Sequence, residues 1–174
     1  RAPSRWNMRR APSALSIEEL RRSQDGFTTD TLAIGDSWFW YPMPGGSLVN
    51  FLGDLVAPKG RNILVAGNNG AEAYDYVNGK YRKQVKELLR LYGGSASAVL
   101  VSGGGNDFAG FNDLRPLLKA DCSAAQSAAD CFRGGNGDGT VGFLVEKMYE
   151  HYALLVTRIL MAVPRSATIL VHCY

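Results

Sequence analysis

From residue 31 onward, the chain alternates short apolar runs with amphipathic segments. Four runs are rich in β-branched residues: TLAIG (31–35), NILVA (62–66), SAVLV (97–101) and ATILV (167–171). Continuous apolar runs of this length are typical of strands buried on both faces of a parallel sheet. We therefore predict four strands, each covered on both sides.

Between these runs, apolar residues recur at helical spacing. The first segment carries Leu48, Phe51, Leu52, Leu55 and Val56, the second carries Tyr81, Val85, Leu88, Leu89 and Tyr92, and the third carries Leu144, Met148, Leu155 and Ile159. The second helix is expected to end at Gly93-Gly94 and the third before Pro164. Alternating strands and helices predict an α/β fold, in which helices cover both faces of a parallel sheet.

Two segments fall outside this alternation. Residues 1–29 form a basic arm, in which Ser16 and Glu19 make a capping box that predicts a short helix over SIEELRR. Residues 121–142 are rich first in Ala and Ser and then in Gly, Asn and Asp, which predicts an excursion over the surface. Residues 30–174 then form one α/β domain.

The charge pattern narrows the range of partners. The net charge of the 174-residue chain is +3, and much of the excess lies in the first 22 residues. We find no basic stripe elsewhere in the sequence, so nucleic-acid binding is not expected. No apolar run approaches the roughly 20 residues that a transmembrane helix needs, so no such segment is predicted.

The three cysteines do not decide between an oxidising and a reducing cellular compartment. Cys122 and Cys131 flank a short polar segment and could close a loop as a disulfide, with Cys173 left over. A bridge of this kind would indicate an extracytoplasmic or secreted protein. Two reduced, buried thiols fit the same spacing.

Small and polar residues follow every predicted strand. The four strands are followed by Gly35-Asp36-Ser37, Gly67-Asn68-Asn69-Gly70, Gly103-Gly104-Gly105-Asn106-Asp107 and His172. In open parallel sheets, ligands bind beyond the carboxyl ends of the strands. A serine there can act as a nucleophile once a base takes its proton, and backbone N–H groups or an amide can stabilise the oxyanion that forms. Ser37, Gly70 and Asn106 would supply such groups if the strand ends converge.

These residues resemble the signature blocks of the SGNH, or GDSL-type, hydrolases. Gly35-Asp36-Ser37-Trp38 is similar to the first block, with Trp in place of the usual Leu. Gly70, in NNGAEA, is similar to the second-block glycine, and Gly104-Gly105-Asn106-Asp107 is similar to the third block. The resemblance spans roughly residues 30 to 173. It implies a three-layer flavodoxin-like sheet of which this chain contains four of the five core strands.

The resemblance also implies an activity and its residues. It indicates a serine esterase or lipase-like hydrolase of small-molecule or lipid esters, which works through an acyl-enzyme without a metal or organic cofactor. Ser37 would be the nucleophile, and the N–H groups of Ser37 and Gly70 with the Asn106 amide would form the oxyanion hole. The aromatic residues after the nucleophile, Trp38 and Phe39 first among them, would line an acyl pocket or pack the first helix against the sheet.

The fourth block of that family, Asp-x-x-His, has no counterpart in this chain. We therefore expect the catalytic Asp and His to come from a segment after residue 174 or from a separate C-terminal chain, and these 174 residues alone to be inactive. His172, at the end of the fourth strand, is a candidate substitute base, whereas His151 is expected on a helix surface. The alternative is a degenerate domain that binds a ligand or partner in the same cleft.

Overall fold

The computed structural model describes residues 14–15, 28–40, 46–108 and 114–172. The strands are β1 (Ala14–Leu15), β2 (Thr28–Gly35), β3 (Arg61–Gly67), β4 (Ala98–Ser102) and β5 (Thr168–His172). The α-helices are α2 (Ser37–Trp40), α3 (Leu48–Val56), α4 (Ala73–Val77), α5 (Arg82–Tyr92) and α7 (Val141–Ala162). The 3₁₀-helices are η1 (Ala57–Lys59), η2 (Gly93–Ser95), η3 (Gly105–Asp107), η4 (Arg115–Leu117) and η5 (Ala128–Cys131).

All strands lie in one parallel sheet in the order β1-β3-β2-β4-β5. The four predicted strands are confirmed as β2 to β5. The two-residue strand β1 was not predicted, and it lies within the segment expected to be an arm. The four long strands follow the flavodoxin-like order, and the chain leaves β2 and β4 toward opposite sides of the sheet. The crevice for a ligand in such a sheet lies between the carboxyl ends of these two strands.

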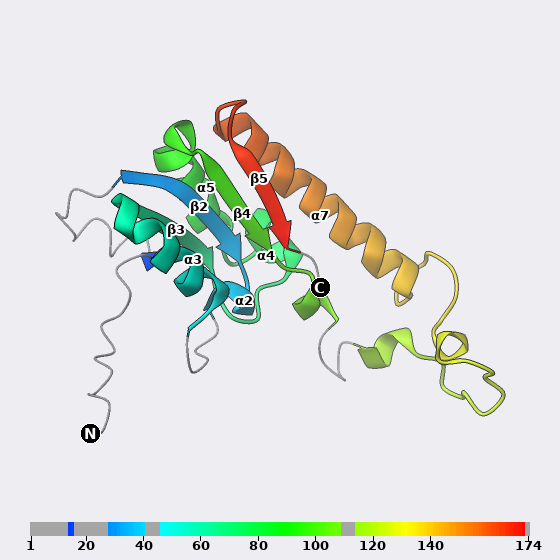
Figure 1. The fold of residues 1–174 in the computed structure, drawn as a ribbon. Helices are drawn as coiled ribbons and strands as arrows, with labels where there is room; N and C mark the ends of the chain where they lie inside the picture. The colour runs from blue at the N-terminus through cyan, green and yellow to red at the C-terminus, as the bar shows by residue number, and fades with distance from the viewer. Residues whose placement is uncertain (1–13, 16–27, 41–45, 109–113, 173–174) are drawn as a thin grey trace, which may run out of the picture.

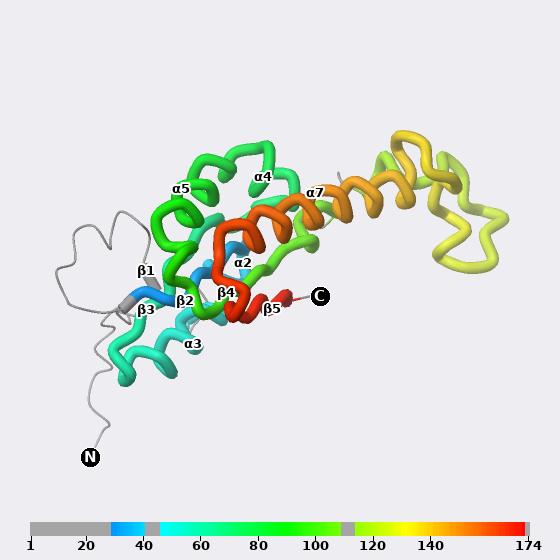
Figure 2. Tube along the Cα trace, turned by 90° about the horizontal axis from the view of Figure 1, so that it is seen from above, coloured from blue at the N-terminus to red at the C-terminus, as the bar shows by residue number. Residues whose placement is uncertain are grey.

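Helices cover both faces of the sheet, as predicted (Figures 1 and 2). On one face, α4, α5 and α7 pack over a core that contains Leu32, Leu64, Val99, Leu155 and Ile159. On the other face, α2 and α3 enclose a smaller core around Ala33, Val49 and Val65. The sheet thus forms the middle of three layers.

The helices follow from their apolar stripes, with one difference. Val85, Leu88 and Leu89 of α5 are buried, as the spacing predicts. In α3, however, Val49 and Gly53 are buried, while Phe51 and Leu55 are exposed. Residues 49 and 53 are four apart and so lie on the same side of α3, which packs against the sheet. Residues 51 and 55 therefore lie on the opposite side of the helix.

Helix α7 is the longest helix of the described residues, and its N-terminal half projects beyond the sheet (Figure 1). Thr140 caps it, because the Thr140 hydroxyl accepts a hydrogen bond of 3.2 Å from the Phe143 N–H. Leu155 and Ile159, in the C-terminal half, are its buried residues. The helix ends at Ala162, two residues before Pro164.

Strand β5 is less covered than the sequence suggested. We expected both faces to be buried, but Leu170 and Val171 are 55% and 56% exposed. Among the described residues, β5 pairs with β4 alone and forms the edge of the sheet. Periodicity cannot distinguish a central strand from an edge strand, because the neighbour that would cover the edge is not encoded in the run itself.

The remaining predictions concern the segments outside the sheet. The excursion predicted for residues 121–142 contains short turns and η5, and it is joined back to the preceding segment by an antiparallel bridge between Leu118 and Phe132. The helix predicted over SIEELRR lies outside the described residues. No helix in the described part of the chain is long and apolar enough to cross a membrane.

Candidate active site at the carboxyl edge of the sheet

The predicted site segments gather at one edge of the sheet, where the strand arrows of β2, β4 and β5 end (Figure 1). The register places the last residues of neighbouring strands side by side: Gly35 beside Gly67, and Ser102 beside His172. Because the strands are parallel, the loops after them must begin at this same edge. The structure therefore brings the three predicted site segments together.

Asp36 joins these segments. It is completely buried, and its Oδ1 accepts hydrogen bonds from the Trp38 N–H (3.2 Å) and the Ser102 hydroxyl (3.1 Å). Its Oδ2 accepts a hydrogen bond of 3.2 Å from Nδ2 of Asn106. A buried carboxylate needs such donors to offset its lost hydration. The same bonds hold the turn that contains Ser37 against the loop that contains Asn106.

Asn106 links this pair to the third segment. Its Nδ2 also donates a 3.1 Å hydrogen bond to the backbone oxygen of Ala71, the residue after Gly70. Ser37, Gly70 and Asn106 therefore lie in adjacent segments that follow β2, β3 and β4. Both N–H groups of the Asn106 amide are engaged by protein acceptors, so one of these bonds must be released before the amide can donate to a substrate oxygen.

The two glycines of the second site segment, Gly67 and Gly70, differ in the space around them. Gly67 has φ +113°, and a Cβ there would lie 2.1 Å from the Gly35 carbonyl oxygen, so the close approach of two loops excludes a side chain. Gly70 has φ +74°, but no atom lies within 4 Å of the position of its Cβ. The space beside Gly70 is open to a ligand.

Ser37 is the first residue of α2 and is half-buried. Its hydroxyl makes no hydrogen bond to any described residue. The side chains that follow it divide between surface and core. Trp38 is 47% exposed, whereas Phe39 is 4% exposed and packs in the core with Ala33 and Val49.

The position of Phe39 decides between its two expected roles: it packs the first helix against the sheet and does not line a pocket. A helical turn points consecutive side chains about 100° apart, so the turn that leaves Trp38 at the surface directs Phe39 against the sheet. Of the two side chains, Trp38 is the one exposed at this edge of the sheet.

His172 lies at this edge, as expected from its place after the fourth strand. Its Nδ1 is 3.4 Å from the Ser102 hydroxyl, and its ring centroid is 5.0 Å from that of Trp38. Ser102 therefore stands between His172 and Asp36. His151, by contrast, packs edge-on against Tyr74 of α4, with 5.4 Å between the ring centroids.

Ser102 was missed as a site residue, whereas Asp107 was expected to cap or orient the loop around Asn106. Ser102 is fully buried between Asp36 and His172, and the one sequence signal for it is a polar residue that ends the apolar run of β4. Asp107 accepts hydrogen bonds from the Ala73 N–H at 3.1 and 3.3 Å, which ties the Asn106 loop to the start of α4. Burial raises the pKa of Asp107 above its ordinary value of 3.8, and the Ala73 hydrogen bonds oppose this shift.

The structure also bears on cofactor and thiol chemistry. No group of three or more His, Cys, Asp or Glu side chains within the described ranges could hold a metal ion. Cys122 and Cys131 are free thiols, and Sγ of Cys122 lies 3.8 Å from the Cys131 carbonyl oxygen. The neighbouring Cys131 side chain raises the pKa of the Cys122 thiol. Cys173 lies outside the described residues.

Comparison with known proteins gave partial structural similarities, two of which are described below. No family model and no curated protein matches the chain. A phospholipase A1 from Streptomyces albidoflavus NA297 is similar at 20% identity and a TM-score of 0.46, over 81% of this chain and 57% of that protein. An extracellular lipase from Streptomyces rimosus is similar at 20% identity and a TM-score of 0.44, over 83% of this chain and 59% of the lipase. The chain thus spans less than two thirds of the length of either enzyme.

Proposed function

We propose that this chain carries the nucleophile and the oxyanion donors of a serine hydrolase that cleaves carboxylic esters. Ser37 is the nucleophile, and the N–H groups of Ser37 and Gly70 and the Asn106 amide are the donors. The observation that supports this assignment best is the hydrogen bond from Asn106 to Asp36, because it brings the amide beside the residue that precedes Ser37. The likeness of these residues to three SGNH signature blocks agrees with it.

The reaction proceeds in two halves. The Ser37 oxygen forms a bond to the ester carbonyl carbon while a base accepts the hydroxyl proton, and the carbonyl electrons move to the oxygen as an oxyanion. The donors stabilise this oxyanion, and each is worth about 3 kcal/mol of barrier. The intermediate then expels the alcohol, which takes the proton from the base. Water, activated by the same base, hydrolyses the acyl-serine.

The base is proposed to come from a segment after residue 174, as a His oriented by an Asp. The imidazole among the described residues at this edge is His172, whose Nδ1 faces Ser102. We assign His172 to the wall of the site, together with Trp38, which would contact the acyl or alcohol group of a small-molecule or lipid ester.

The nucleophile is tested by the hydrolysis of p-nitrophenyl acetate and butyrate. The protein extended beyond residue 174 is compared with its Ser37→Ala and Asn106→Ala variants and with residues 1–174 alone. We expect Ser37→Ala to lose activity by at least about 10³-fold and Asn106→Ala by about 10²-fold. Residues 1–174 should hydrolyse the esters at close to the Ser37→Ala rate. Equal rates for parent and Ser37→Ala would contradict the assignment.

The origin of the base is tested separately with His172→Ala. If the base follows residue 174, this variant retains most of the parental kcat, and the residues after 174 contain an Asp-x-x-His whose His→Ala variant is inactive. A loss in His172→Ala that equals the loss in Ser37→Ala would assign the base to His172 instead.

A second candidate function is ligand or partner binding by a degenerate site. It is favoured by the Asn106 amide, since both of its N–H groups already have protein acceptors, Asp36 and the Ala71 carbonyl. A fluorophosphonate probe separates the two functions, because it labels an activated serine covalently. Labelling that is lost in Ser37→Ala supports the hydrolase, and absence of labelling in the extended protein supports the binding domain.

A further inference from the structure

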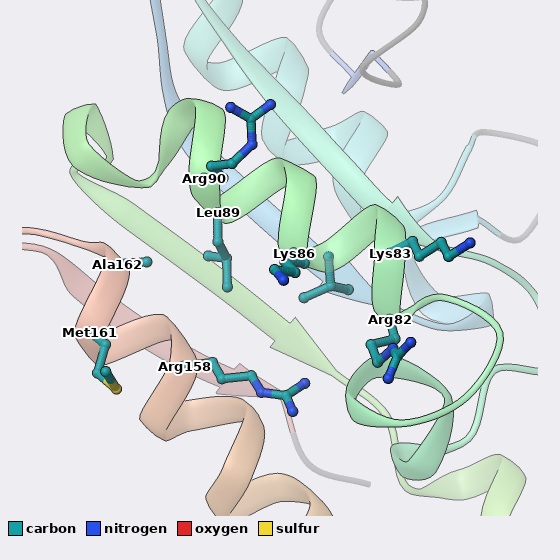
Figure 3. A pocket seen from close by; sticks show the side chains of 9 residues that line it. Arg82, Lys83, Lys86, Leu89, Arg90, Arg158, Met161 and Ala162 are labelled. Carbon is teal, nitrogen blue, oxygen red and sulfur yellow. The ribbon is translucent and has the colours of Figure 1, made fainter.

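A cationic groove lies between α5 and α7, on the helical layer (Figure 3). Its cavity is about 630 Å³. The charged residues that line it are Arg82, Lys83, Lys86, Arg90 and Arg158. None of its lining residues is acidic, and Val85 and Leu89 supply apolar surface from α5.

The positive charge on α5 forms a stripe. Arg82, Lys86 and Arg90 are spaced four residues apart, so their side chains follow one face of the helix. Like charges at this spacing destabilise a helix. No acidic residue is among those that line the groove, so this face of α5 attracts anions. This stripe corrects the expectation that no basic stripe lies outside the N-terminal arm, because it becomes visible only once the helical face of α5 is known.

Arg158 fixes one positive charge on the opposite wall. It is half-buried, and its Nη1 donates a 2.7 Å hydrogen bond to the backbone oxygen of Val77. This acceptor is uncharged, so the bond holds the guanidinium in place without neutralising it. A guanidinium has five N–H donors in a planar fork that suits phosphate oxygens.

The last turn of α7 adds exposed apolar side chains to this charged surface. Met161 lines the groove and is 83% exposed, and the adjacent Leu160 is 61% exposed. Basic residues beside exposed apolar ones are typical of surfaces that lie at a lipid interface, where cations bind headgroups and apolar side chains enter the acyl boundary. Single-stranded nucleic acid is instead bound with stacked aromatic rings, and none lines this groove.

We propose that the groove docks the protein on an anionic lipid surface. Arg82, Lys86 and Arg158 bind headgroup phosphates, and Met161 enters the boundary between headgroups and acyl chains. This docking does not depend on the proposed ester hydrolysis, because the groove and the residues around Ser37 share no side chain.

The test is co-sedimentation with vesicles of phosphatidylcholine, with and without phosphatidylglycerol. We expect binding to the anionic vesicles only. The double variant Arg82→Gln/Lys86→Gln should bind about 30-fold more weakly, since each basic residue near an anionic surface contributes about a five-fold increase in affinity. The matched control Lys59→Gln/Lys119→Gln removes the same charge from exposed positions elsewhere and should bind within about two-fold of the parent. Far-ultraviolet circular dichroism verifies that both variants are folded.

Further measurements distinguish lipid from other anions. Met161→Ser should reduce the binding that remains at about 0.5 M salt, where charge attraction is screened. Equal losses in the two double variants, or unchanged binding of Met161→Ser, would overturn the proposal. Complete displacement of the protein from the vesicles by inorganic phosphate would also overturn it. The same holds if the protein binds duplex DNA through Arg82 and Lys86 but does not bind vesicles.

Discussion

At the scale of single residues, Asp36 holds the segments of the site together, although it is assigned no chemical step. Its carboxylate accepts hydrogen bonds from the Trp38 N–H, the Ser102 hydroxyl and the Asn106 amide, and these bonds join the first and third site segments. We predict that Asp36→Ala lowers the free energy of unfolding by about 3 kcal/mol, because it leaves the Ser102 and Asn106 donors buried without this acceptor. Urea titration measures the change. Asp54→Ala, an exposed acid on α3, is the control and should stay within about 0.5 kcal/mol of the parent.

Asp107 makes a contribution to stability that depends on pH. Burial raises the pKa of its carboxyl in the folded protein, so the unfolded chain releases the proton first as pH rises above 3.8. The folded state then binds more protons than the unfolded state, and stability falls with rising pH until the raised pKa is passed. The Asp107→Asn variant lacks this pH-dependent contribution to stability, because an amide does not titrate. Its side-chain oxygen can still accept a hydrogen bond from the Ala73 N–H.

The stability of Asp107→Asn relative to the parent should therefore increase with pH and then level off. Urea unfolding from about pH 3.5 to about pH 7 measures this difference. An advantage that shrinks as pH rises would show that the Ala73 hydrogen bonds outweigh the cost of burying the charge.

At the scale of elements, the packing of the first two site loops depends on Gly67. A Cβ there would overlap the Gly35 carbonyl oxygen, and the left-handed φ adds strain. We predict that Gly67→Ala lowers the free energy of unfolding by more than about 3 kcal/mol.

Gly70→Ala is the matched control for this substitution. It has the same sign of φ but open space around its Cβ, so it should cost only the left-handed strain of about 1 to 2 kcal/mol. Thermal unfolding compares the two. Equal losses would mean that backbone strain, and not the contact with Gly35, decides the cost at position 67.

At the scale of the whole molecule, residues 1–174 cover the two edges and faces of the sheet unequally. Leu170 and Val171 are exposed on β5, and unpaired edges with apolar side chains promote association between sheets. We predict for residues 1–174 that Leu170→Lys reduces their concentration-dependent light scattering and changes their stability by no more than about 0.5 kcal/mol. Unchanged scattering together with a large loss of stability would show that Leu170 is part of the core.

The sequence by itself determined the strands β2 to β5, the helices between them and the polar loops at the carboxyl edge. Each of these features is local, because apolar periodicity and glycine placement within a short segment specify it. Only the tertiary structure decided that Phe39 enters the core while Trp38 stays exposed, and that Ser102 connects Asp36 with His172. These outcomes depend on strand register and on neighbours distant in the chain, and no short stretch of sequence contains that information.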